Sequence, residues 1–246
     1  VALANETALE TSANVTLANA VQLNGQATVN TTLNASALAL SNTITGTGSL
    51  TKTGLGTLSL NGNNTYEGGT TITKGNVIVS NNAALGKGSV IFSNNTGLET
   101  STAVSLANAM RLDGKTTINT QTHNSRLMGV MSGTGDLTKI GTGSLALEAN
   151  NSNYIGGINI NAGKLVINDS KALGSGAMTF ATGTELATSK SIVVNNQMTL
   201  AGNVTVTNAD ALEVKNLRGV GSLTKSGLGD LTLSASNAHT GGTIIN

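Results

Sequence analysis

The sequence predicts an all-β fold, a parallel β-helix in which roughly 11–12 short coils stack into one rod. Three observations lead to this prediction. The 246-residue chain repeats itself about every 87 residues, and short alternating strands recur about every 20 residues inside each copy. The composition includes 31 glycines, no proline and only 2% aromatic residues. Together these features indicate a narrow, regularly turned, repetitive structure rather than an ordinary globular core.

The composition favours a narrow interior. A wide core is normally filled by aromatic side chains, yet this chain has two Phe, two Tyr and no Trp. We therefore expect an interior lined by Leu, Ile, Val and Ala. Proline removes a donor from the hydrogen-bond ladder, so its absence suits an uninterrupted sheet, and frequent glycine suits many tight turns.

The charge and the lack of cysteine exclude several classes of site. The net charge is +1 and there is no cysteine, so the chain has no disulfide and no thiolate metal site. The absence of basic clusters predicts that nucleic acid is not a partner. Apolar runs such as Ala37–Leu40 are far too short to span a bilayer, and we expect no direct membrane insertion of this segment.

A heptapeptide marks each copy of the long repeat. It reads GTGSLTK at Gly46–Lys52, GTGDLTK at Gly133–Lys139 and GVGSLTK at Gly219–Lys225, with offsets of 87 and 86 residues. An alternating strand and a polar turn ending in Gly-Gly follow each time. We therefore divide the single β-helix segment 1–246 into the tail of an earlier repeat, two copies and the start of a further copy: residues 1–45, 46–132, 133–218 and 219–246.

Within one copy, alternating runs begin at Leu58, Val77, Leu98 and Ile118, and the next copy resumes at Leu137. The spacing of about 20 residues fits one solenoid coil, so each copy should form about four coils. No run has the 3.6-residue period of an amphipathic helix. A β-sandwich also has short strands, but it has no reason to repeat in this way. Small insertions between copies should lie in loops.

The motifs resemble the passenger-associated repeat of bacterial autotransporters. The resemblance rests on Leu50–Leu60 and Asn64–Thr73, and it continues through Ala84–Gly88 and Leu106–Ala109. It implies a right-handed β-helical passenger, exported through the outer membrane and either displayed at the bacterial surface or released. It also implies that the translocator barrel lies elsewhere in the parent chain. Passengers of this kind are mostly adhesins, self-aggregation factors, proteases or toxins.

Both termini of the sequence fall inside repeat units, so we expect a piece of a longer passenger. Solenoids normally protect their ends with atypical capping repeats, and Thr240–Asn246 still follows the repeat. Uncovered terminal coils would fray and associate end to end, because their backbone groups are unpaired.

The sequence provides no recognisable catalytic residues. Protease-type autotransporters carry a Gly-Asp-Ser-Gly motif, which is absent, and His123 and His239 are the only histidines. His239 stands where other copies have Tyr66 and Tyr154, so we interpret it as a turn residue that replaces tyrosine. His123 lies where the copies differ in length, and we expect it in an exposed loop.

Carbohydrate-active β-helix enzymes need paired carboxylates, often with Arg, Lys or calcium. The acids Asp113, Asp136, Glu148 and Asp169 have no acidic neighbour in the sequence, and the arginines are Arg111, Arg126 and Arg218. Stacked coils can bring distant acids together, so this alternative stays open. No calcium-binding nonapeptide is present. We predict no enzymatic activity, no cofactor and no metal site.

The heptapeptide resembles a phosphate loop only superficially. A P-loop needs Gly directly before Lys, whereas Thr51 precedes Lys52, and the same peptide occurs three times. We expect Lys52, Lys139 and Lys225 to be solvated turn residues, four coils or about 19 Å apart.

The leading functional hypothesis is an extracellular surface adhesin or self-association factor. Its partner would be a host surface protein, matrix or glycan, or a second copy on a neighbouring cell, with many weak contacts summed by multivalency. A secreted ligand or toxin for a host receptor is the alternative, and it needs a non-repeated patch, sought at Gln121–Arg126 and Asn208–Arg218. A structural stalk is a further alternative. The sequence names no partner-binding residues.

Overall fold

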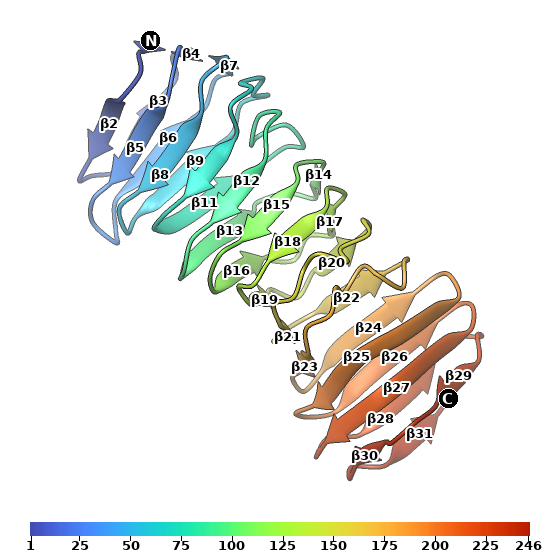
Figure 1. Ribbon diagram of the computed structural model, residues 1–246. Coiled ribbons are helices and arrows are strands. Elements are labelled where there is room, and N and C mark those ends of the chain that lie inside the picture. The colour runs from blue at the N-terminus through green and yellow to red at the C-terminus, as the bar shows by residue number, and fades with distance from the viewer.

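A computed structural model describes all residues, 1–246, and contains strands but no helix. The chain forms a rod of about 12 stacked coils, with its termini at opposite ends (Figure 1). All paired strands run parallel, as the sequence predicts for a β-solenoid, although β25 and β27 are much longer than the rest. No helix is present that could cross a membrane.

Four parallel sheets make up the rod. The first is a three-stranded sheet near the N-terminus, formed by β1 (Ala2–Leu3), β4 (Val21–Leu23) and β7 (Ile44–Gly46). The seven-stranded sheet contains β2 (Thr7–Thr11), β5 (Ala27–Thr31), β8 (Leu50–Thr53), β10 (Thr70–Ile72), β12 (Val90–Phe92), β15 (Met110–Leu112) and β18 (Met131–Gly133).

The two larger sheets continue along the rod. The 13-stranded sheet contains β3 (Val15–Leu17), β6 (Ala37–Leu40), β9 (Thr57–Leu60), β11 (Gly75–Val79), β13 (Thr96–Thr100), β16 (Thr116–Asn119), β19 (Leu137–Ile140), β21 (Ile158–Ile160), β23 (Met178–Phe180), β25 (Ile192–Leu200), β27 (Leu212–Gly219), β29 (Leu231–Leu233) and β30 (Ala238–His239). The eight-stranded sheet contains β14 (Ser105–Leu106), β17 (Ser125–Leu127), β20 (Ser144–Leu147), β22 (Lys164–Ile167), β24 (Thr184–Thr188), β26 (Val204–Asn208), β28 (Leu223–Ser226) and β31 (Thr243–Ile245).

The coil spacing predicted from the sequence matches the pairing of residues between neighbouring strands of the 13-stranded sheet. Leu58 pairs with Val77, Val77 with Leu98, and Leu98 with Ile118. The next partner is Lys139 rather than Leu137, which is two residues away on the same strand and the same side. The coil repeat is therefore confirmed, with a small error where the next copy begins.

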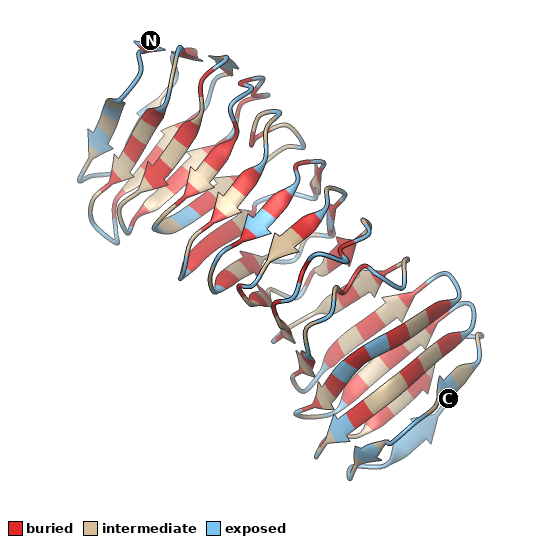
Figure 2. Cartoon of the chain, in the orientation of Figure 1, coloured by how far each residue is buried: buried red, intermediate tan, exposed pale blue.

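The core follows the alternation of the strands, and Figure 2 shows buried and less buried residues alternating along most of them. Leu, Ile and Val supply most of a single cluster of 50 buried residues. The expectation of a purely aliphatic interior was too narrow, since Tyr66, Phe92, Tyr154 and Phe180 are all fully buried. Only these four large rings occur in about 12 coils, so the interior stays narrow.

The three copies of the heptapeptide do not stack above one another. Lys52 lies on β8 of the seven-stranded sheet, Lys139 on β19 of the 13-stranded sheet and Lys225 on β28 of the eight-stranded sheet. Through the chain of paired residues, Lys139 aligns with Leu58 on β9, the strand that follows β8. In the same way, Lys225 aligns with residue Leu145 on β20, the strand that follows β19.

One repeat therefore advances the chain by four coils along the rod and by one additional side around it. In residues 125–140 the chain passes through β17, β18 and β19, one strand from each of the three larger sheets. Successive copies thus present the same motif on three different sides. The expected separation of four coils between the lysines omits this additional change of side.

One step of the drift between copies lies in a loop, as expected, whereas another falls at the irregular pairing of β25 with β27. The offset is 87 residues from Leu58 to Leu145 and 88 residues from Gly68 to Gly156. The additional residue falls in the turn after β20, within residues 148–153, where the structure has no strand. The core strands on either side keep their register.

Candidate binding surface

The repeated lysine is a buried structural group. Lys52 is fully buried, and its Nζ donates hydrogen bonds to three backbone carbonyls: Thr53 at 2.7 Å, Gly54 at 2.8 Å and Lys74 at 3.1 Å. Thr53 ends β8 and Gly54 begins the turn after it, whereas Lys74 belongs to the next coil. The interpretation of these lysines as solvated turn residues was wrong, because the ammonium ties two coils together.

Lys139 repeats this arrangement on another sheet. Its Nζ donates to the carbonyls of Gly141 and Ala162, both at 2.9 Å, to that of Ile140 at 3.4 Å, and to Thr120 Oγ1 at 3.1 Å. Gly141 has a φ of 82°, so only a glycine turns its carbonyl toward the ammonium without strain. We call Lys52, Lys139 and Lys225 the caged lysines.

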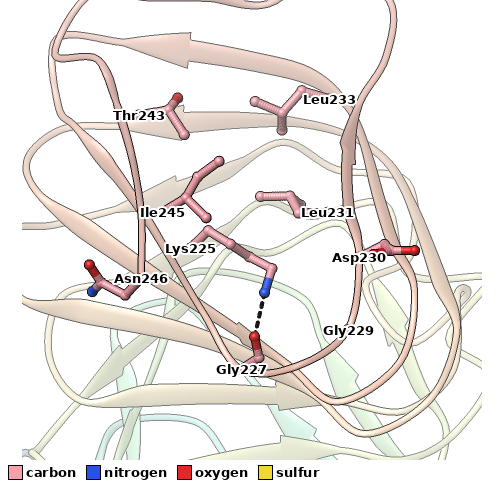
Figure 3. A pocket seen from close by; sticks show the side chains of 9 residues that line it. All are labelled: Lys225, Gly227, Gly229, Asp230, Leu231, Leu233, Thr243, Ile245 and Asn246. Atoms are coloured by element: carbon pink, nitrogen blue, oxygen red, sulfur yellow. Dashed lines mark hydrogen bonds between the residues drawn. The ribbon is translucent and has the colours of Figure 1, made fainter.

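Lys225 makes the same contacts with the turn that follows its strand. Its Nζ donates to the carbonyls of Ser226 at 3.2 Å and Gly227 at 2.7 Å, and Figure 3 shows the second of these bonds. A hollow of about 310 Å³ lies beside it, with a mixed lining that includes Leu231 and Leu233 as well as Asp230.

Burial shifts the protonation of these groups. Desolvation lowers the pKa of both Lys52 and Lys139 to about 8. Both lysines therefore remain charged at neutral pH. The alternation of the sequence contained a signal for their burial, because Lys52 is two residues from the inward-facing Leu50 on the same strand.

The tyrosines fill a corner of the core, and two other repeated motifs surround them. Tyr154 Oη donates toward the carbonyls of Gly135 and Gly157, each at 2.9 Å, and accepts from Leu137 N at 3.0 Å. Burial raises the pKa of the Tyr154 hydroxyl. Gly86 has a φ of 69°, and a Cβ there would lie 2.8 Å from the ring of Tyr66. This contact explains glycine in the Ala-Leu-Gly motif.

The histidines do not form a catalytic pair. His239 Nε2 lies 2.9 Å from Thr243 Oγ1, and Tyr66 makes the same contact with Thr70 in the first copy. The structure therefore places His239 where the repeat has tyrosine, although it is half-buried rather than fully buried. His123 lies in the turn between β16 and β17, partly exposed, on a different coil.

The acids are used locally, and the structure does not gather them into one site. Arg111 bonds to Asp113 at 2.6 Å, and Glu148 accepts from Arg126. Asp136 accepts from Gly157 N, and Asp169 from Lys171 N. No group of three or more His, Cys, Asp or Glu is arranged to hold a metal ion. Arg218 is exposed and has no ion-pair or hydrogen-bond partner.

Asparagines connect the coils at the turns, although they do not stack into a continuous ladder. Asn64 Nδ2 donates to the carbonyl of Ala84 at 2.6 Å, and its Oδ1 accepts from Ile44 N at 2.7 Å. Asn151 makes the equivalent bonds to Ala172 and Met131 in the next copy. One side chain thus bridges three successive coils, which satisfies backbone groups that no strand pairs.

The two stretches expected to hold a non-repeated patch lie far apart along the rod. Residues 121–126 form the turn before β17 and its first half, and Gln121 has a φ of 50°. Residues 208–218 include most of β27, whose two halves pair with β29 and β30. The structure does not bring them together: His123 belongs to the first stretch, and Arg218 of the second pairs with Ala238, next to His239.

A flat polar surface lies on the outward side of the 13-stranded sheet. Seven residues on successive strands pair directly in one line, which we call the outer row: Gly97, Thr117, Thr138, Asn159, Thr179, Thr199 and Arg218. The five central side chains are half-buried and make no hydrogen bond within the chain. Their hydroxyl and amide groups are therefore free to bind water or a partner.

A hollow of about 80 Å³ interrupts this surface at Gly97. It is lined by Asn76 and Glu99 together with the beginning of the outer row. Glu99 Oε2 accepts from Asn119 Nδ2 at 3.0 Å, and the carboxylate makes no ion pair. The hollow therefore offers acceptor oxygens and one unneutralised negative charge. The sequence contained no signal for it, because it depends on the exact register of neighbouring coils.

Comparison with protein families gives one match. The passenger-associated transport repeat matches residues 50–79, 137–167 and 223–246, and each segment begins at the strand that carries a caged lysine. No curated protein and no solved structure matches the chain significantly. The three matches show that this chain carries passenger-associated transport repeats, and these repeats together with the parallel β-solenoid fit an autotransporter passenger segment.

Proposed function

We propose that this passenger segment acts as an adhesin or self-association factor, displayed at the bacterial surface or released from it. The observation that carries the proposal is the rotation of the repeat. Because each copy advances four coils and one side, Lys52, Lys139 and Lys225 and the turns around them lie on three different sheets. A partner can therefore meet the same motif from several directions.

The surface chemistry supports weak, repeated contacts. The centre of the outer row carries hydroxyl and amide groups and no charge, so each contact with a partner is a hydrogen bond of modest net strength. Many such contacts made at once give useful avidity. The partners of this chemistry are a host surface protein, matrix or glycan, or a second copy of the chain on a neighbouring cell.

We also propose that the role is not enzymatic. The acids that could serve a glycosidase, such as Asp113 and Glu148, hold neighbouring arginines in exposed pairs. Retaining glycosidases instead hold two carboxyl groups about 5 Å apart across the scissile bond. Incubation of the chain with polysaccharides would test this, and release of reducing ends would overturn it.

Beads coated with residues 1–246 test the proposal directly. Clumping of the beads supports self-association, and attachment to host cells or matrix supports adhesion. Albumin-coated beads are the control. Beads that neither clump nor attach would overturn both roles and favour a structural stalk.

A further inference from the structure

We propose that two copies of this chain associate face to face through the outer row, with Arg218 of each copy seated in the Gly97 hollow of the other. This inference rests on the proposed self-association and specifies its surface. It begins from two unsatisfied charges on one face. Arg218 is exposed without a partner, and the Glu99 carboxylate in the hollow has no ion pair.

The two groups lie at opposite ends of the row. Six strand spacings separate Gly97 from Arg218, a distance of about 29 Å at about 4.8 Å for each spacing. No ion pair inside one chain can span that distance. An ion pair between these two groups must therefore join two chains, and each chain offers both halves of the pair.

A two-fold axis brings the halves together. A half-turn about an axis that lies between the two faces and parallel to their strands reverses the order of the row. With the axis at Asn159, the row centre, Arg218 faces Gly97, Thr199 faces Thr117, and Asn159 faces its own copy. In such an isologous contact each copy contributes one Arg218 and one hollow, so two identical ion pairs form.

The chemistry of the hollow suits a guanidinium group. A guanidinium needs planar acceptor oxygens, and Glu99 together with the amide oxygen of Asn76 supplies them. A Cβ at Gly97 would lie 2.1 Å from Asn76 Oδ1, so a larger residue there would displace this acceptor. Between the two ends, small polar side chains leave the face flat enough for close approach.

The contact area predicts weak association. A strip about 29 Å long and three residues, or about 10 Å, wide covers roughly 300 Å² on each copy. Stable complexes bury about 1,200–2,000 Å² in total, so a single pair of copies should dissociate readily. Many passengers facing each other on neighbouring cells would still adhere through multivalency.

Thiol cross-linking tests the arrangement, because the chain has no cysteine of its own. Facing sheets pack about 10 Å apart, too far for a direct disulfide, so a short bis-maleimide is the probe. Asn159→Cys should form a covalent dimer with it, since the residue opposes itself. Thr117→Cys alone should not, but a mixture of Thr117→Cys and Thr199→Cys chains should. Thr71→Cys, which is outward and half-buried on the seven-stranded sheet, is the matched control. Equal dimer formation by Thr71→Cys and Asn159→Cys would overturn the proposal.

A charge reversal tests the ion pairs separately. Arg218→Glu in the Asn159→Cys chain should reduce the initial rate of dimer formation about tenfold, because like charges then meet at both ends. Adding Glu99→Arg should restore the rate, which a merely damaged fold cannot do. Failure of the double variant to recover would overturn the pairing.

The bead assay separates this proposal from the proposed function. Beads that clump while Asn159→Cys forms no dimer would disprove this interface and leave self-association standing. The absence of both would disprove both. If beads attach to host cells and Glu99→Arg abolishes the attachment without affecting clumping, the hollow binds a host ligand and the second copy is excluded as its occupant.

Discussion

Replacing Lys139 by methionine tests the structural role of the caged lysines. Methionine has a similar length and no charge, so it fills the space without donating hydrogen bonds. The change removes the donor from the backbone carbonyls of Gly141 and Ala162, which lie partly buried at a turn between coils, whereas the carbonyl of Ile140 still accepts from Thr120 N. Lys190→Met is the matched control, because Lys190 is exposed.

The expected loss of stability follows from two opposing effects. Each buried carbonyl left without a donor costs about 1–3 kcal/mol. Removing a buried charge returns several kcal/mol of desolvation. Because the pKa of Lys139 remains at about 8, the ammonium is still charged at pH 7, and its carbonyl acceptors offset most of that cost. The net expectation is destabilisation by about 2–4 kcal/mol, against less than about 0.5 kcal/mol for the exposed control.

Urea unfolding followed by circular dichroism measures this difference, and amide hydrogen exchange locates it. Since each coil contacts only its neighbours, protection should fall mainly in the coils on either side of Lys139, that is, near β16 and β21. A variant as stable as the wild type, with unchanged exchange, would show that water satisfies these carbonyls and that the cage is not needed.

Three further predictions concern the same buried groups. Between pH 8 and pH 10 the chain should become more stable, by about 1–2 kcal/mol for each lysine whose pKa burial lowers to about 8, because the unfolded state still binds those protons. Above pH 10 the trend should reverse, since the buried tyrosines hold protons that the unfolded chain releases. Urea midpoints across pH measure both, and a flat profile would contradict the burial. Tyr154→Phe leaves the carbonyl of Gly135 without a donor, whereas Leu137 N and the carbonyl of Gly157 still bond to each other at 2.9 Å, and we expect a loss of about 1–3 kcal/mol in thermal unfolding. A loss under about 0.5 kcal/mol would mean that water replaces the hydroxyl. Gly86→Ala should be more destabilising than Gly183→Ala, because both have positive φ (69° and 77°) but only the Gly86 Cβ meets the Tyr66 ring. Equal melting temperatures would attribute the whole effect to backbone strain.

The sequence predicted the coil because hydrophobic alternation and coil length are local signals. Leu58, Val77, Leu98 and Ile118 face the core in succession, and they are four coils of one sheet. The burial of Lys52 was not predicted from the sequence. Lysine is almost always solvated, and this general expectation was given more weight than the alternation, which places Lys52 on the inward side. Tyrosine was likewise assigned to a turn, although its hydroxyl needs only a few partners to be buried.

The Gly97 hollow and the unpaired Arg218 could not be predicted in this way. They belong to one row only because coil lengths between them vary from 19 to 21 residues, as the paired residues show. An error of one residue in any of the six steps would move Arg218 to the inward side. Long-range placement on a solenoid therefore needs the register of every coil.

The length of the repeat determines how the passenger presents its motifs. Four coils of about 20 residues would make a repeat of about 80 residues and would stack all copies on one side. The observed offset of 87 residues adds about a third of a coil, so three repeats complete one circuit of the rod in about 13 coils. At about 4.8 Å for each coil, the same motif returns to the same side only after about 62 Å. A flat partner would therefore contact one copy of the motif at a time, and high avidity would require partners around the rod. An insertion of about one third of a coil in each repeat would change this presentation without disturbing the core, because the strands would keep their inward and outward sides.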